Sequence, residues 1–268
     1  KDFFPGSIQK KRFLGNVMNQ LFINIGTVSP ATLVKQLEKS LNEKQIVAYS
    51  RDRDIQQYLE KNYWSGRTLK PKCNLPQAIN CILDYIFPVD ANLGVNKANF
   101  FVSRPTKMNI GIQENGVIKN TVTLTYTNNS YEDIFPGGPY KNYFQLFMPP
   151  NSQVEQIMVD DVPLTDYDET NFEYKTIGFL LTVPPRDSRI VQVTYTLPTT
   201  IIGGNGMYQL IFQKQIGSAN DNLQLEFDLP DNISVVNNNF SPLVKGNKII
   251  YNTSISSDKI FLIEFSKN

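Results

Sequence analysis

The polar side chains most able to bind a ligand lie in residues 89–104, "VDANLGVNKANFFVSR", where they alternate with apolar ones. The polar members are Asp90, Asn92, Asn96, Lys97, Asn99 and Arg104. One interpretation is a structural joint, in which the Asp and Asn side chains bond to the backbone of a turn around Gly94. We favour this interpretation, because turn-forming side chains need no ligand to explain them. The alternative is a binding site, with five candidate contacts: Asp90, Asn92, Asn96, Lys97 and Arg104.

A second candidate site is "YSRDRD" at residues 49–54. Arg51 and Arg53 follow an expected strand, and ligands of open α/β sheets bind at the carboxyl ends of strands, where arginines hold phosphates. The alternative, which we favour, is that Asp52 or Asp54 caps the next helix while both arginines stay exposed.

The composition limits the catalytic chemistry available to the chain. It has 268 residues and no histidine, so neutral-pH acid/base chemistry would require an Asp, Glu, Lys or Tyr with a strongly shifted pKa. Five acidic residues lie close together in sequence: Asp160, Asp161, Asp166, Asp168 and Glu169. Their carboxylate oxygens are of the kind that binds calcium, but a solvated hairpin explains the cluster better. We therefore predict no metal, no cofactor and no catalytic residue, and an enzyme is the less favoured possibility.

The two cysteines, Cys73 and Cys81, are close enough in sequence to close a short loop. A disulfide there would contribute roughly 2.5 kcal/mol of loop entropy. Two buried free thiols are the other possibility. We favour the disulfide because the chain has the β-rich character of secreted proteins.

Net charge excludes one large class of partner. Lysine and arginine exceed acidic residues by one, and charged residues make up 19% of the chain. No basic field is available for nucleic acid. No run of residues is apolar and long enough to span a membrane.

The first hundred residues have mainly helical periodicity. Residues 7–25 place Phe13, Leu14, Val17, Met18, Leu21, Phe22 and Ile25 on one face. Residues 29–44 form a second expected helix with Ser29 as N-cap, and residues 53–64 form a third. Between them, residues 45–50 ("QIVAYS") are typical of a short buried strand. Because one strand makes no sheet, we expect residues 1–104 to be the C-terminal part of a larger α/β domain.

After residue 104 the periodicity changes to two, which predicts half-buried antiparallel strands. An internal repeat is visible as well: residues 142–157 align with 222–237, and residues 176–195 align with 247–265. We therefore predict an α+β multidomain chain with two Ig-like β-sandwich modules, at residues 105–200 and 201–268. The second module is the shorter one.

Four segments in this order resemble the C-terminal half of the domain of unknown function 4012 family. They are "IVAYSRDRDIQQYLEKNYWSG", "DYIFPVDANLGVNKANFFVSR", "NGVIKNTVTLTYTN" and "PYKNYFQLFMPPNSQV". The resemblance implies a bacterial envelope protein with an upstream membrane helix and an extracytoplasmic region. A more distant resemblance links the family to the LytR–CpsA–Psr glycopolymer ligases, in which residues 9–21 would bring Lys11 and Arg12 near a pyrophosphate-lipid site.

The leading hypothesis is therefore a cell-surface module with a binding, adhesion or structural role, anchored to the membrane through an upstream segment. Its expected partners are an envelope glycopolymer or a surface protein, together with the missing N-terminal half of the same protein. The alternative is the C-terminal part of a phosphoglycan transferase whose catalytic residues lie upstream.

Overall fold

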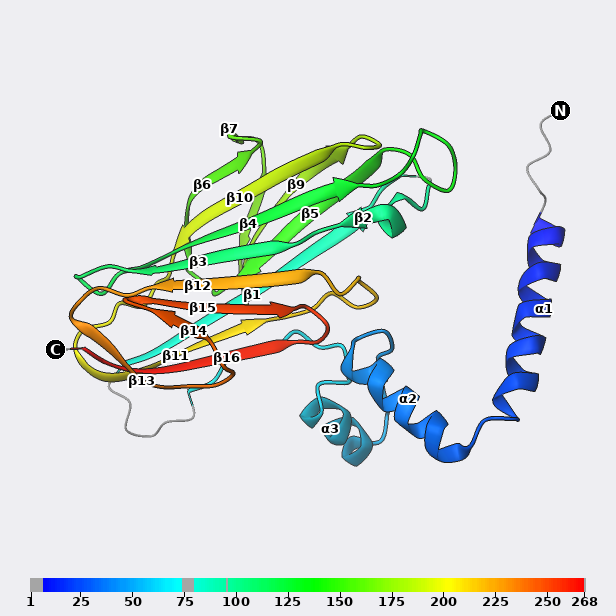
Figure 1. The fold of residues 1–268 in the computed structure, drawn as a ribbon, viewed down its shortest axis with the longest axis horizontal. Helices are drawn as coiled ribbons and strands as arrows, with labels where there is room; N and C mark the ends of the chain where they lie inside the picture. The colour runs from blue at the N-terminus through cyan, green and yellow to red at the C-terminus, as the bar shows by residue number, and fades with distance from the viewer. Residues whose placement is uncertain (1–6, 74–79, 95, 268) are drawn as a thin grey trace.

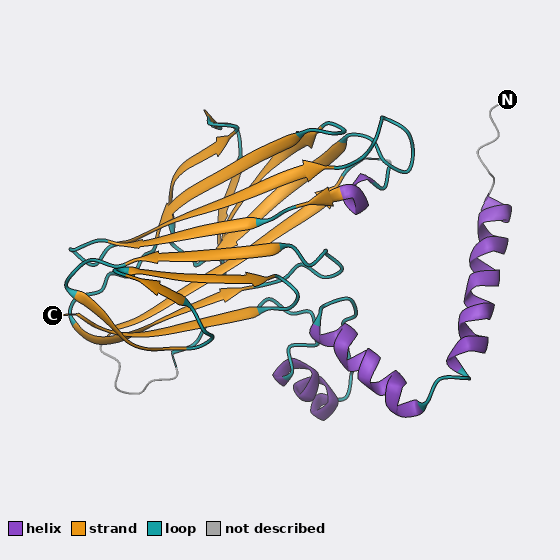
Figure 2. Ribbon diagram, in the orientation of Figure 1, coloured by secondary structure: helices purple, strands orange, loops and turns teal. Residues whose placement is uncertain are grey.

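The protein is a large β-sandwich preceded by a helical arm (Figure 1). A computed structural model describes residues 7–73, 80–94 and 96–267. Strands make up most of the molecule, and the helices lie to one side of them (Figure 2). None of the described helices is long and apolar enough to cross a membrane.

Three helices form the arm, at the expected places: α1 (Ser7–Ile25), α2 (Pro30–Asn42) and α3 (Arg53–Lys61). Ser29 caps α2 as predicted, because its Oγ accepts a hydrogen bond from the Thr32 backbone N–H at 3.2 Å. The apolar face predicted for α1 has no partner among the described residues. Its seven residues, from Phe13 to Ile25, are 39–67% exposed, and the helix extends away from the sandwich (Figure 1).

The prediction of a strand at residues 45–50 was wrong. That segment joins no sheet: Gln45 N and Ile46 N donate back to Ser40 O at the end of α2, and Ala48 N donates to Trp64 O at 3.0 Å. A short apolar run becomes a strand only when a neighbouring strand satisfies its backbone, and here the neighbours are helices. Among the described residues before β1 there is accordingly no α/β layer.

Two mixed sheets form the sandwich. The first has the order β13 (Ile233–Asn238), β16 (Lys259–Lys267), β11 (Gly204–Phe212), β1 (Asn80–Asn92), β5 (Tyr140–Met148), β9 (Lys175–Val183), β8 (Asp168–Asn171). The second has the order β14 (Leu243–Lys245), β15 (Lys248–Ser254), β12 (Asn222–Asp228), β3 (Thr106–Ile112), β4 (Ile118–Asn128), β10 (Ser188–Thr196), β6 (Gln153–Val159), β7 (Val162–Pro163). The short β2 (Val102–Ser103) pairs with β4, after the 3₁₀ turn η1 (Ala98–Phe101).

The internal repeat is present in the strand pairing. In the first repeat, β5 pairs with β9 and β9 with β8, while β4 pairs with β10 and β10 with β6. In the second repeat, β12–β15–β14 and β11–β16–β13 have the same arrangement. The β5–β9–β8 half of the first repeat lies in the first sheet, whereas the equivalent β12–β15–β14 half of the second repeat lies in the second sheet. Each sheet therefore contains one half of each repeat.

A single linking strand joins the repeats in each sheet. In the second sheet β3 lies antiparallel to β4 and parallel to β12. In the first sheet, β1 runs parallel to β11 through residues 80–86 and antiparallel to β5 through residues 87–92. The predicted modules 105–200 and 201–268 therefore lie side by side within shared sheets and share one hydrophobic core. β1, from the segment 1–104 that we expected to be helical and α/β, is a central strand of the sandwich.

The helical arm is fastened to the sandwich just before β1. The side chain of Gln213 accepts from Leu69 N at 2.9 Å and donates to Arg67 O at 3.0 Å. A disulfide between Cys73 and Cys81 then closes the chain onto the beginning of β1. The bond predicted from the sequence is thus formed.

One carboxylate lies between the two sheets. Asp84 on β1 is fully buried and accepts hydrogen bonds from Tyr208, Tyr195 and Asn120, which come from three other strands. Burial raises the pKa of Asp84 to about 6, although these donors and the Tyr85 N–H oppose the shift.

Candidate binding pocket between the two repeats

Residues 89–104 form the connection from β1 to β3. Asn92 at the end of β1 accepts from Gly94 N at 2.9 Å, and Asn96 accepts from Ala98 N at 3.3 Å. A Cβ on Gly94 would lie 2.9 Å from Asn96 Oδ1 and 3.0 Å from Asn92 Oδ1, so a side chain there would displace the two amides that form the turn. Asn96 also donates to Pro139 O at 2.9 Å, which ties the turn to the β4–β5 loop.

A buried ion pair lies beneath this turn. Arg104 Nη1 bonds to Asp90 Oδ2, with the two side chains 8% and 15% exposed. The other oxygen of Asp90 accepts from the hydroxyl of Tyr126 at 2.7 Å and from the amide of Asn142. Burial alone would lower the pKa of Arg104, but Asp90, Tyr126 and Asp221 together raise it, so the guanidinium stays charged.

The second repeat contributes its β11–β12 loop. The side chain of Gln215 accepts from Asp90 N at 3.0 Å and donates to Asp90 O at 2.8 Å, thereby substituting for a neighbouring strand. Asp221 accepts from Arg104 N at 3.0 Å. Residues from both repeats are thus bonded to the same short segment.

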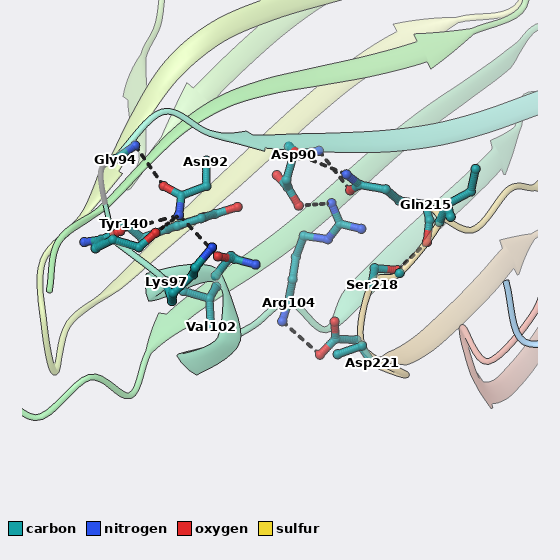
Figure 3. A pocket seen from close by; sticks show the side chains of 15 residues that line it. Asp90, Asn92, Gly94, Lys97, Val102, Arg104, Tyr140, Gln215, Ser218 and Asp221 are labelled. Atoms are coloured by element: carbon teal, nitrogen blue, oxygen red, sulfur yellow. Dashed lines mark hydrogen bonds and ion pairs between the residues drawn. The ribbon is translucent and has the colours of Figure 1, made fainter. Parts of the chain in front are cut away.

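The joint also encloses a cavity of about 400 Å³ (Figure 3). This volume is within the usual range for small-molecule sites. Its lining comes from three stretches distant in sequence: Asp90, Asn92, Gly94, Asn96, Lys97, Asn99, Val102 and Arg104; Tyr140; and Gln215, Ile216, Gly217, Ser218, Ala219 and Asp221. We call this cavity the seam pocket.

Some groups in the seam pocket are not used by the fold. Among the described residues, the Lys97 ammonium, the Asn99 amide N–H₂, the Tyr140 hydroxyl and one oxygen of Asp221 have no hydrogen-bond or ion-pair partner. None of them is among the fully buried unpaired atoms. They are therefore free to bond to a ligand in the pocket.

The structure brings together five of the seven binding candidates predicted from the sequence, namely Asp90, Asn92, Asn96, Lys97 and Arg104. Arg51 and Arg53 do not join them: both are exposed and flank Asp52. Asp52 caps α3 by accepting from Asp54 N and Ile55 N at 3.0 and 3.1 Å.

Sequence reasoning missed the far wall of the pocket. The β11–β12 loop contains "GSAND" (217–221), a composition that indicates a turn and nothing more. No local pattern relates it to a segment more than 100 residues earlier. Tyr140 was missed because it continues the apolar alternation of β5.

The acidic group near residue 160 forms the expected hairpin. Asp160 and Asp161 have positive φ angles at the turn between β6 and β7. Asp160 pairs with Arg189 at 3.3 Å, and Asp168 accepts from the hydroxyl of Tyr143. No group of metal-ligating side chains large enough to hold an ion occurs among the described residues.

Comparisons with known proteins assign no family. No family model matches the chain, and no curated protein does. Solved structures are similar only in part. A candidate nutrient binding protein from Legionella pneumophila has a TM-score of 0.44 at 10% identity, covering 67% of this chain and 70% of that one.

Two enzyme structures are also similar in part. The M1 zinc metallopeptidase from Deinococcus radiodurans has a TM-score of 0.34 at 9% identity, over 60% of this chain and 42% of that one. Leukotriene A4 hydrolase from Saccharomyces cerevisiae has a TM-score of 0.38 at 9% identity, over 64% and 30%. At TM-scores below 0.5 the likeness transfers neither a fold family nor an activity to this chain.

Proposed function

We propose that this chain is a non-enzymatic, extracytoplasmic surface module that binds a ligand in the seam pocket. The observation that carries the proposal is the pocket itself, with its fixed walls and its unused polar groups. The side chains that build the walls are bonded to one another, so the pocket is organised before a ligand arrives.

Two further observations support the extracytoplasmic location. The Cys73–Cys81 disulfide is typical of an oxidising compartment. The resemblance to the domain of unknown function 4012 family points to the bacterial envelope. Each repeat, with at least three strands in either sheet, is on this proposal an Ig-like module.

The exposed face of α1 provides a place for the remainder of such a protein. An exposed apolar face on a helix usually lies against another element, and we propose that the upstream half of the same protein covers it. The transferase alternative would instead use Arg12, which is exposed on α1.

Co-sedimentation of the purified chain with insoluble bacterial envelope material tests the function. We expect the protein to pellet with the material, and Tyr140→Phe to reduce the bound fraction. Tyr49→Phe is the matched control, because Tyr49 is 77% exposed and lies outside the pocket. Failure of the unaltered chain to pellet with any envelope fraction would remove the proposed function.

A further inference from the structure

We infer that the ligand of the seam pocket is an uncharged saccharide. This inference rests on the proposed function, because it names the ligand class for the same site. Charge, hydrogen-bonding capacity and the apolar part of the lining support it independently.

The charges that line the pocket cancel. Lys97 and Arg104 contribute two positive charges, and Asp90 and Asp221 contribute two negative ones, so the formal sum is zero. A phosphate or other dianion would meet two carboxylates, one of them already neutralising the arginine. A ligand without net charge meets no such opposition.

The unused groups include donors as well as an acceptor. The Lys97 ammonium and the Asn99 amide are donors, the Tyr140 hydroxyl can act as either, and Asp221 offers a carboxylate oxygen. A sugar hydroxyl both donates and accepts, so neighbouring hydroxyls can satisfy such a mixed set. A purely anionic ligand offers only acceptors and would leave the Asp221 oxygen desolvated and unpaired.

Apolar side chains complete the match. Val102 and Ile216 line the pocket between the polar groups. A pyranose ring has C–H faces as well as hydroxyls, and these can lie against aliphatic carbon. The fixed Asp90, Asn92 and Gln215 framework holds both kinds of surface without reorganisation when the ligand binds.

An array of neutral oligosaccharides, including glucans, mannans and chito-oligosaccharides, tests the inference with the full chain. Array hits are then titrated calorimetrically beside inorganic pyrophosphate and a polyuronate. We expect saturable binding of at least one neutral saccharide. We also expect its Kd to change less than about twofold between roughly 0.05 and 0.5 M salt, because screening acts on charged ligands.

Two pocket variants and two matched controls locate the site. Tyr140→Phe and Lys97→Ala each remove a group that the fold does not use, and each should raise the Kd about three- to tenfold without lowering Tm. Tyr49→Phe and Lys35→Ala remove the same groups at exposed positions outside the pocket and should leave Kd unchanged.

The outcomes separate the ligand class from the function. Pelleting with envelope material, but with affinity only for pyrophosphate or polyuronate, would overturn the saccharide inference and leave the surface function standing. Saccharide binding that both pocket variants retain at full affinity would overturn the assignment to this pocket. Absence of binding to both envelope material and arrays would overturn the proposed function itself.

Discussion

At the scale of single residues, Asn92 has a structural task. Its side chain accepts from Gly94 N and donates toward Asn96 O and Asn99 Oδ1, so it closes the turn that forms one wall of the pocket. We expect Asn92→Ala to cost about 1–2 kcal/mol and to lower Tm by about 3–6 °C. Thermal melting followed by circular dichroism measures this directly.

Lys97→Ala is the comparison for that melt, since the Lys97 side chain has no partner among the described residues and its loss should leave Tm unchanged. If Asn92→Ala melted like the unaltered chain while losing its ligand, the turn would be a recognition element and the structural interpretation would be wrong.

A second residue-scale prediction concerns Asp84. Its pKa in the folded protein is about 6, above the value of 3.8 of the unperturbed group, because burial disfavours the charged carboxylate. The folded state therefore binds a proton that the unfolded state has lost. Asp84 therefore makes its full contribution to the free energy of unfolding below about pH 4. This contribution falls by about 3 kcal/mol as the pH rises from 4 past 6.

Asp84→Asn removes the titrating group but keeps the side-chain shape. Urea midpoints at several pH values should show the unaltered chain losing stability between pH 4 and 6 relative to the variant. Other carboxylates, such as Glu155 and Glu226 with lowered pKa values, act equally on both proteins and cancel in the difference. Parallel pH profiles for the two proteins would contradict the assignment.

At the scale of elements, the disulfide fastens the chain just before the strand that links the repeats. Cys81 lies on β1 beside Met207 of β11, so the bond restrains the entry into the first sheet. Intact mass after alkylation should show no adduct on the native protein and two adducts after reduction, and Cys73→Ser with Cys81→Ser should lower stability by about 2.5 kcal/mol. Two alkylated thiols in the native protein would refute the bond.

A buried ion pair fastens the helical arm. Lys44, just after α2, lies 2.9 Å from Asp258 in the β15–β16 turn, and the side chains are 5% and 6% exposed. Asp258→Asn removes the carboxylate partner of the buried Lys44 ammonium and leaves it only the carbonyl of Tyr63, which costs about 3–5 kcal/mol. We expect hydrogen exchange to speed up in residues 30–72 and to stay unchanged in the sandwich.

Lys39→Ala is the matched control for the arm, because its pair with Glu43 is 3.8 Å long and mostly exposed. Exchange rates in residues 30–72 should not respond to it. If Asp258→Asn left these rates unchanged as well, contacts other than this pair would hold the arm.

The strands also show which parts of the fold local sequence patterns can predict and which they cannot. Strands with one face to water, such as β4, β10 and β12, were predicted because their residues alternate. β1 was not, because its middle is buried on both faces and Pro88 interrupts it. Its partner β11 lies over 100 residues away, so no local pattern identifies the pairing. The β11–β12 loop wall of the seam pocket could not be predicted for the same reason.

At the scale of the whole molecule, the repeat predicted from the sequence determines the strand order, but it does not determine whether the two repeats form separate sandwiches. Leu146 and Leu225 occupy equivalent strands β5 and β12, Tyr195 and Phe265 occupy β10 and β16, and all four are buried. A repeat seen in sequence indicates two similar folding patterns. Whether they stand apart or share sheets depends on β1 and β3, which lie outside the aligned segments.

Because the repeats share both sheets and one core, we expect the sandwich to unfold in a single transition. Calorimetry should give one peak, with the calorimetric and van't Hoff enthalpies equal. Near-ultraviolet circular dichroism, which reports tyrosines of both repeats, should follow the same curve.

The helical signal in far-ultraviolet circular dichroism is the internal control. Because α1 contacts little of the sandwich, it should lose its structure at a lower temperature (Figure 1). Two separate sandwich transitions would mean that pairing across β1 and β3 is weaker than pairing within each repeat. The seam pocket would then lie on a hinge between two bodies, and ligand binding would be expected to merge the transitions by stabilising only the joined state.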